Sequence, residues 1–132
     1  MDDFNGEPIT SMTQIDQYLI VSLSDQMTVE MIESVMNTIL EKARQGVKGV
    51  LLNYVMIASI DTRSFNAYKK ISATLKVMGV PSVWVNLKPG VICSLLDLNV
   101  DLDNWSVCTA GNLNDGISLL EKGRGKKEQD NV

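Results

Sequence analysis

The six residues Ile60-Asp61-Thr62-Arg63-Ser64-Phe65 place a hydroxyl and a carboxylate where a helix is predicted to begin. They follow the apolar run from Gly49 to Ile57 and precede a helical pattern that continues to about Met78. The first turn of a helix has backbone N–H groups without partners inside the helix, and it carries a partial positive charge. Thr62 is therefore expected either to cap this helix or to accept a phosphate group, whose charge the helix end would tolerate.

Two serines near Thr62 are alternative acceptors. Ser64 is predicted to be exposed on the same first turn, and Ser59 lies in the loop before the helix. Asp61 is expected to be the N-cap residue or to orient the acceptor hydroxyl, and the two roles are compatible.

Composition argues against several classes of function. The 132 residues carry a formal net charge of −4 and no histidine. A nucleic-acid-binding domain would normally show a basic face, and histidine is the commonest general base and metal ligand. Cys93 and Cys108 are too far apart for a metal cage or a CxxC motif, and we predict that both are small buried residues. We therefore expect no enzymatic activity, no metal and no cofactor.

Two other phosphate-related α/β domains are weaker alternatives. No GxGxxG motif follows a strand and no P-loop is present, which disfavours a small-ligand or nucleotide-binding domain. A phosphoaccepting receiver domain needs an acidic pair after its first strand and a lysine after its last. Ser24-Asp25 supplies one carboxylate and Thr109-Ala110-Gly111 supplies no lysine.

The sequence also indicates where the protein resides. No segment approaches the roughly 20 apolar residues of a membrane span. Residues 1–6 include acidic side chains where a secretory signal would need basic ones. We predict a cytoplasmic protein without a membrane partner.

Outside the helix start at residue 62, strand and helix patterns alternate along the chain. The predicted strands are apolar runs bounded by turn residues, at 12–15, 18–23, 50–52, 83–85 and 105–109. The predicted helices show apolar residues at helical spacing and begin after Thr28, near Thr62, at Lys88-Pro89 and after Asn112. This order predicts a single α/β domain with a mixed, mostly parallel sheet that starts with a hairpin, and about four helices packed against it.

Across about residues 12 to 122, the chain resembles the STAS domain, the fold of anti-sigma-factor antagonists. Three features carry the resemblance. The first is Ile60-Asp61-Thr62 after the third strand, where the family places Asp before a phosphorylatable Ser or Thr. The others are the ungapped spacing from there to Lys76-Val77-Met78-Gly79, and the turn and helix start Asn86-Leu87-Lys88-Pro89-Gly90-Val91. The short length is most similar to that of the small scaffold subunit of the stressosome. The corresponding boundaries are a flexible lead-in at 1–10, a STAS domain at 11–122 and a disordered polar tail at 123–132.

Two positions depart from the family pattern. Asn53 stands where many members carry aspartate. Scaffold subunits more often have serine at the acceptor position, and the threonine found here at Thr62 is commoner in their RsbR-type paralogues.

The resemblance implies a non-enzymatic scaffold that self-associates and co-assembles with RsbR-type STAS paralogues in a large complex. It further implies that the complex sequesters a serine/threonine switch kinase, which phosphorylates Thr62 and is then released, and that a phosphatase resets the site. Asp61, Arg63 and Ser64 are the implied kinase contacts. A stand-alone anti-sigma-factor antagonist, which binds an anti-sigma kinase directly, is the alternative.

Overall fold

The computed structural model describes residues 11–97 and 107–130, with side chains described for 11–97 and 107–123. The predicted lead-in and residues 105–106 of the last predicted strand lie outside these ranges. The strands are β1 (Ser11–Ile15), β2 (Tyr18–Ser22), β3 (Gly49–Asn53), β4 (Ser82–Val85) and β5 (Cys108–Ala110). The helices are α1 (Val29–Arg44), α2 (Thr62–Val77), α3 (Pro89–Asp97) and α4 (Leu113–Asp130).

The described strands form one mixed sheet in the order β1-β2-β3-β4-β5. β1 and β2 are antiparallel and form the predicted hairpin, whose turn includes Asp16 with a φ of 54°. All later neighbours pair in parallel. β3 is the central strand and is buried along its whole length, as its unbroken apolar sequence predicted. The predicted α/β fold class is confirmed.

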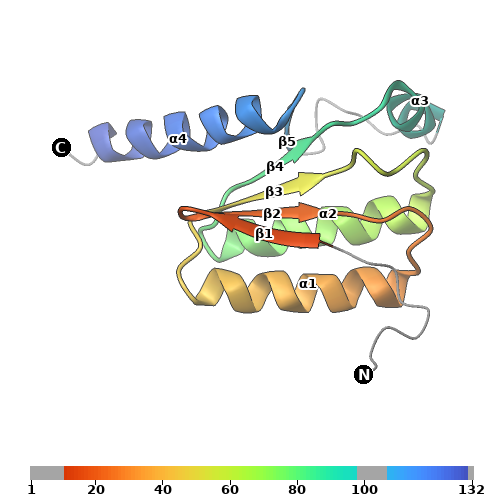
Figure 1. The fold of residues 1–132 in the computed structure, drawn as a ribbon, viewed down its shortest axis with the longest axis horizontal. Coiled ribbons are helices and arrows are strands. Elements are labelled where there is room, and N and C mark those ends of the chain that lie inside the picture. The colour runs from red at the N-terminus through yellow and green to blue at the C-terminus, as the bar shows by residue number, and fades with distance from the viewer. Residues whose placement is uncertain (1–10, 98–106, 131–132) are drawn as a thin grey trace.

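Helices cover the sheet on both faces (Figure 1). α1 and α2 pack side by side on one face, over a core that includes Leu19, Val50, Leu52 and Trp84. α4 packs on the other face, over β3, β4 and β5, where Leu120 joins Leu51 and Val83 in a second cluster. Successive side chains of each strand point to opposite faces of the sheet, so the same strands contribute to both clusters. The sheet is therefore packed on both faces, which fixes the position of the carboxyl ends of its strands.

Local signals in the sequence set the helix boundaries. Thr28 caps α1, because its hydroxyl accepts a hydrogen bond from the Met31 backbone N–H at 3.1 Å. Gly79 follows α2 with a φ of +81°, a conformation that glycine adopts at little cost. Pro89 is the first residue of α3, as predicted. Asn112 caps α4 by accepting from the Asp115 backbone N–H at 2.9 Å.

α4 differs from the predicted element in length and in how closely it approaches the sheet. It reaches Asp130, beyond the boundary that we placed at residue 122, because the Arg, Lys, Glu and Gln residues of this segment all favour helix. A Cβ added at Gly116 would lie 2.6 Å from Leu51 Cδ2 and 2.8 Å from Val85 Cγ1. The absent side chain at Gly116 therefore lets the start of α4 rest directly on β3 and β4.

The prediction that both cysteines are buried is wrong. Cys93 and Cys108 are free thiols and both are exposed. Cys93 lies on α3, whose buried side is formed by Val91 and Leu95, and Cys108 lies on the short edge strand β5. Cysteine is a residue type that is often buried, which is why burial was predicted. Cys93 is exposed because it lies on the face of α3 that does not contact the core, and Cys108 is exposed because β5 is an edge strand.

Candidate functional site

The carboxyl ends of β2, β3 and β4 are tied together by one polar residue. Asn53, the last residue of β3, donates from Nδ2 to Ser22 Oγ at 3.1 Å. Its Oδ1 accepts from the Val55 backbone N–H at 3.1 Å and from Asn86 Nδ2 at 2.9 Å. The side-chain amide thus both donates and accepts, which an ionised aspartate could not do at this position. The network fixes the points at which the β2–α1 and β3–α2 loops leave the sheet.

Asp61 caps the helix that starts beyond the β3–α2 loop. Its Oδ1 accepts from the Ser64 backbone N–H at 2.8 Å, and its backbone is extended, as an N-cap requires. This hydrogen bond, a second one from the Ser64 side chain and the nearby Arg63 charge lower the pKa of the Asp61 carboxyl. The carboxylate is therefore ionised at neutral pH and satisfies one of the free N–H groups of the first turn.

Thr62 is the first residue of α2, and it is exposed. Asp61 occupies the capping position, so the alternative in which Thr62 itself caps the helix is wrong. Within the described part of the chain, its hydroxyl makes no hydrogen bond. The Thr62 side chain, which the sequence analysis predicted as the acceptor, is thus accessible, has no partner among the described residues and lies at the positive end of a helix.

The other predicted site residues surround Thr62 but differ in accessibility. Arg63 and Ser59 are exposed, whereas Ser64 is half-buried. The prediction that Ser64 is exposed on the first turn is therefore wrong: this residue lines a pocket together with the buried Tyr68. Thr62 is the more accessible of the two hydroxyls on this turn.

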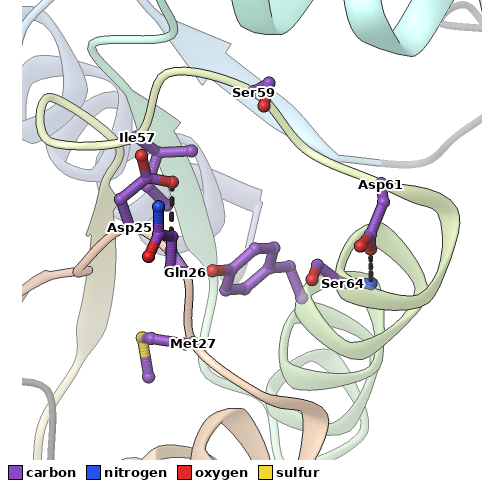
Figure 2. Close-up of a pocket in the computed structure, with 8 residues that line it drawn as sticks. Asp25, Gln26, Met27, Ile57, Ser59, Asp61 and Ser64 are labelled. Atoms are coloured by element: carbon purple, nitrogen blue, oxygen red, sulfur yellow. Dashed lines mark hydrogen bonds between the residues drawn. The ribbon is translucent and has the colours of Figure 1, made fainter.

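A pocket of about 350 Å³ lies beside the start of α2. It is lined by residues of the β2–α1 loop, the β3–α2 loop and α2, namely Asp25, Gln26, Met27, Ile57, Ser59, Asp61, Ser64 and Tyr68. Figure 2 shows Asp25 and Gln26 on one side of the pocket and Asp61 and Ser64 on the other. Burial and the nearby carboxylates of Asp25 and Asp61 raise the pKa of Tyr68 to about 12.

Five of these pocket residues were not among the predicted site residues: Asp25, Gln26, Met27, Ile57 and Tyr68. Asp25 was considered in the sequence analysis only as half of an acidic pair. A signal was nevertheless present, because loops that follow neighbouring parallel strands meet at the carboxyl edge of the sheet. Asp25 follows β2 and Asp61 precedes the helix after β3, so their presence in one pocket could have been inferred from the predicted topology.

The lining limits what the pocket can bind. It contains two carboxylates and no basic side chain, which disfavours the phosphates of a nucleotide. No group of three or more His, Cys, Asp or Glu side chains suited to a metal ion occurs among the described residues. None of the helices in the described ranges is both long and apolar enough to cross a membrane.

Comparison with protein-family models and with curated proteins found no match. Solved structures do match, over nearly the whole domain. A serine-to-glutamate variant of Moorella thermoacetica RsbS matches with a TM-score of 0.71 and 22% identity, over 86% of this chain and 95% of that one. A chain in a structure on the molecular architecture of the stressosome matches with a TM-score of 0.63 and 23% identity, over 85% and 96%.

A third solved structure is the anti-sigma factor antagonist SpoIIAA in its unphosphorylated form. It matches with a TM-score of 0.59 and 12% identity, over 89% of this chain and 99% of that one. These similarities agree with the element order and with the mixed sheet described above. The chain therefore has the fold of a STAS domain, the fold it shares with RsbS and with anti-sigma factor antagonists.

Proposed function

We propose that this chain is a non-enzymatic scaffold subunit of a stressosome, which holds a serine/threonine switch kinase and releases it when Thr62 is phosphorylated. The observation that carries the proposal is that Thr62, the first residue of α2, is exposed, while Asp61 caps the helix. The structural similarity to RsbS and to a stressosome chain supports the choice of assembly.

The switch acts through local electrostatics. A phosphate adds about 1.5 to 2 negative charges at a point that carries a neutral hydroxyl. The phosphate would stand beside the Asp61 cap, but the helix N-terminus favours an anion and the first turn of α2 contains no further acidic residue, so we expect the domain to stay folded. A kinase docked over Thr62 must instead desolvate the phosphate or repel it, and its affinity falls.

The surface around Thr62 is suited to a protein partner. In the β3–α2 loop that leads to Thr62, Met56 is 65% exposed, and its neighbour Val55 is also exposed. These side chains offer exposed apolar area in the loop that precedes the acceptor, and protein interfaces combine such area with polar groups. Arg63 and Asp61 add charges that can orient the kinase.

In this function, RsbR-type paralogues and further copies of this chain complete a large cytoplasmic complex, and a phosphatase removes the phosphate from Thr62. Mass spectrometry after incubation with the kinase and ATP tests the central step. We expect one phosphate, on Thr62, which is retained in Ser64→Ala and absent from Thr62→Ala. Phosphate on Ser59 or Ser64 of the unchanged protein would contradict the proposed acceptor.

The similarity to SpoIIAA favours a second candidate, a stand-alone anti-sigma-factor antagonist with the same acceptor. The two functions differ in assembly. Size-exclusion chromatography with an RsbR-type paralogue separates them, because only a scaffold subunit co-elutes in a particle of megadalton size. Elution as a small complex with an anti-sigma kinase alone would favour the antagonist.

A further inference from the structure

The exposed side of α2 is a basic surface. This helix contains four basic residues and no acidic one, namely Arg63, Lys69, Lys70 and Lys76. Lys69 is half-buried and its Nζ lies over the ring of Phe65, 5.3 Å from the ring centroid, whereas the other three are exposed. In a chain with a formal net charge of −4, α2 therefore stands out as a local concentration of positive charge.

The neighbouring helix α1 begins with the opposite charge. Glu30 and Glu33 are both exposed, and no basic residue occurs in the first half of this helix. The third glutamate of α1, Glu41, forms an ion pair with Arg44 at 3.4 Å, near the end of the helix. The uncompensated acidic charge of α1 is thus confined to its first two turns.

The acidic and the basic side chains lie on the same side of the domain. α1 and α2 pack side by side and run in the same direction, from the carboxyl edge of the sheet to its amino edge (Figure 1). Each helix has 16 residues, and Glu30 and Arg63 are each the second residue of their helix. Within the described part of the chain, no ion pair engages either of the two glutamates, Arg63 or Lys70.

We propose that this two-helix face binds a second copy of the chain, with the first half of α1 of each copy lying on α2 of the other. A two-fold axis between the helices and parallel to both places each α1 opposite the other copy's α2 and keeps their directions the same. Glu30 and Glu33 of one copy then lie opposite Arg63 and Lys70 of the other, and this contact occurs twice. Pairing α1 with α1, or α2 with α2, would instead oppose like charges.

The charge pattern favours a second copy over other partners of a basic helix. Because α1 adjoins α2, an extended nucleic acid or an anionic membrane laid on α2 would also meet the exposed Glu30 and Glu33. A second copy meets the basic residues with its own glutamates and the glutamates with its own basic residues. The face is thus complementary to itself. Exposed ion pairs are individually weak and are screened by salt, so we expect a weak dimer that dissociates as the ionic strength rises.

This contact gives a defined surface to the self-association that is part of the proposed function. Its assignment to a stressosome rests on that function, whereas the contact itself rests on the charges of α1 and α2. The test therefore uses the full chain without kinase or paralogue. A failure of the contact and a failure of the Thr62 switch are then separate results.

Sedimentation equilibrium of the full chain and of two charge-reversed variants tests the contact. The unchanged protein should self-associate at low ionic strength and dissociate when salt is added. The α2 variant Arg63→Glu/Lys70→Glu and the α1 variant Glu30→Lys/Glu33→Lys should each weaken self-association by about tenfold or more, because each makes both contacts like-charged. An equimolar mixture of the two variants should associate at least as tightly as the unchanged protein, since every contact between them again joins opposite charges.

Two comparisons separate the contact from the effect of net charge. Lys48→Glu/Lys122→Glu changes the net charge as the α2 variant does, but at exposed positions outside α1 and α2, and should change the affinity by less than about twofold. The α1 variant raises the formal net charge from −4 to 0, a change that by itself promotes association. Weaker association of the α1 variant therefore identifies the local contact.

The results that would overturn the proposal are distinct. An unchanged protein that sediments as a monomer at every concentration would refute the dimer. If the α2 variant lost self-association and the α1 variant kept it, the basic side chains would bind another acidic surface and the pairing with α1 would be wrong. A mixture that failed to associate would also refute the pairing. Far-UV circular dichroism like that of the unchanged protein shows that each variant is folded.

Discussion

The starts of α1 and α2 are two versions of one structure that differ by the position of a threonine. Both helices follow neighbouring parallel strands and both have a side-chain cap. At α1, the Thr28 hydroxyl itself accepts the hydrogen bond from Met31 N–H. At α2, Asp61 accepts from Ser64 N–H and the threonine comes one residue later.

That one-residue difference decides which hydroxyl is free. The Thr28 oxygen is engaged in its own helix, and Glu30 already places a negative charge in the first turn of α1. The Thr62 oxygen has no partner among the described residues, and the first turn of α2 contains no acidic side chain. Of these two helix starts, only the second therefore has an available hydroxyl, while each carries one carboxylate: Glu30 in the first turn of α1 and the Asp61 cap of α2.

The largest difference between the two helix starts should be in kinase binding. Thr62→Asp places a permanent negative charge at the proposed acceptor, and we expect the affinity for the kinase to fall at least tenfold, or about 1.4 kcal/mol. Thr28→Asp adds the same charge at α1 and keeps the cap, because aspartate and threonine both cap well. Isothermal titration calorimetry with the kinase measures both.

The Thr28→Asp variant should bind the kinase within twofold of the unchanged protein. If Thr62→Asp also bound that tightly, a charge at this helix start would not evict the kinase. If both variants lost affinity together, the effect would reflect net charge and the contrast between the helices would have no functional meaning.

The two caps should contribute similarly to stability at neutral pH but respond differently to acid. Thr28→Ala and Asp61→Ala should each lower the free energy of unfolding by about 1 kcal/mol. The pKa of the Asp61 carboxyl is lowered in the folded state, chiefly by the hydrogen bond from the Ser64 backbone. Its contribution is thus fully present above the unfolded pKa of about 4 and is lost as the pH falls through the lower folded pKa.

Urea unfolding between pH 7 and pH 3 measures this contrast. The difference between the unchanged protein and Asp61→Ala should shrink at the acid end, whereas the difference for Thr28→Ala should stay constant, because a hydroxyl does not titrate in this range. A constant penalty for Asp61→Ala across the whole range would mean that the ionised carboxylate is not what caps α2.

Signals local in the sequence explain why most of the fold could be predicted. Thr28, Asp61, Asn112 and Pro89 each act within one helical turn of their own position, and the predicted helices begin where these residues place them. The unbroken apolar run at β3 likewise indicated a strand covered on both faces. Such features need no knowledge of the rest of the chain.

The features that escaped prediction depend on distant segments. Tyr68 is buried in an apolar part of α2, but only the approach of the β2–α1 loop places Asp25 in the same pocket. The partial burial of Ser64 depends on the segments that form the pocket it lines, and the exposure of Cys93 depends on which face of α3 meets the core. A pattern in one segment fixes its periodicity, whereas tertiary packing decides what each side chain meets.

The smallest expected effect is on the stability of Thr62→Ala. Because the Thr62 hydroxyl has no partner among the described residues and alanine favours helix more than threonine, the free energy of unfolding should change by less than about 0.5 kcal/mol. Urea unfolding at pH 7, with Thr28→Ala as the matched threonine variant, measures it. A loss as large as that of Thr28→Ala would give the Thr62 hydroxyl a structural role. Without such a loss, the fold does not depend on a hydroxyl at this position, and modification of Thr62 can act on a docked partner while the domain keeps its structure.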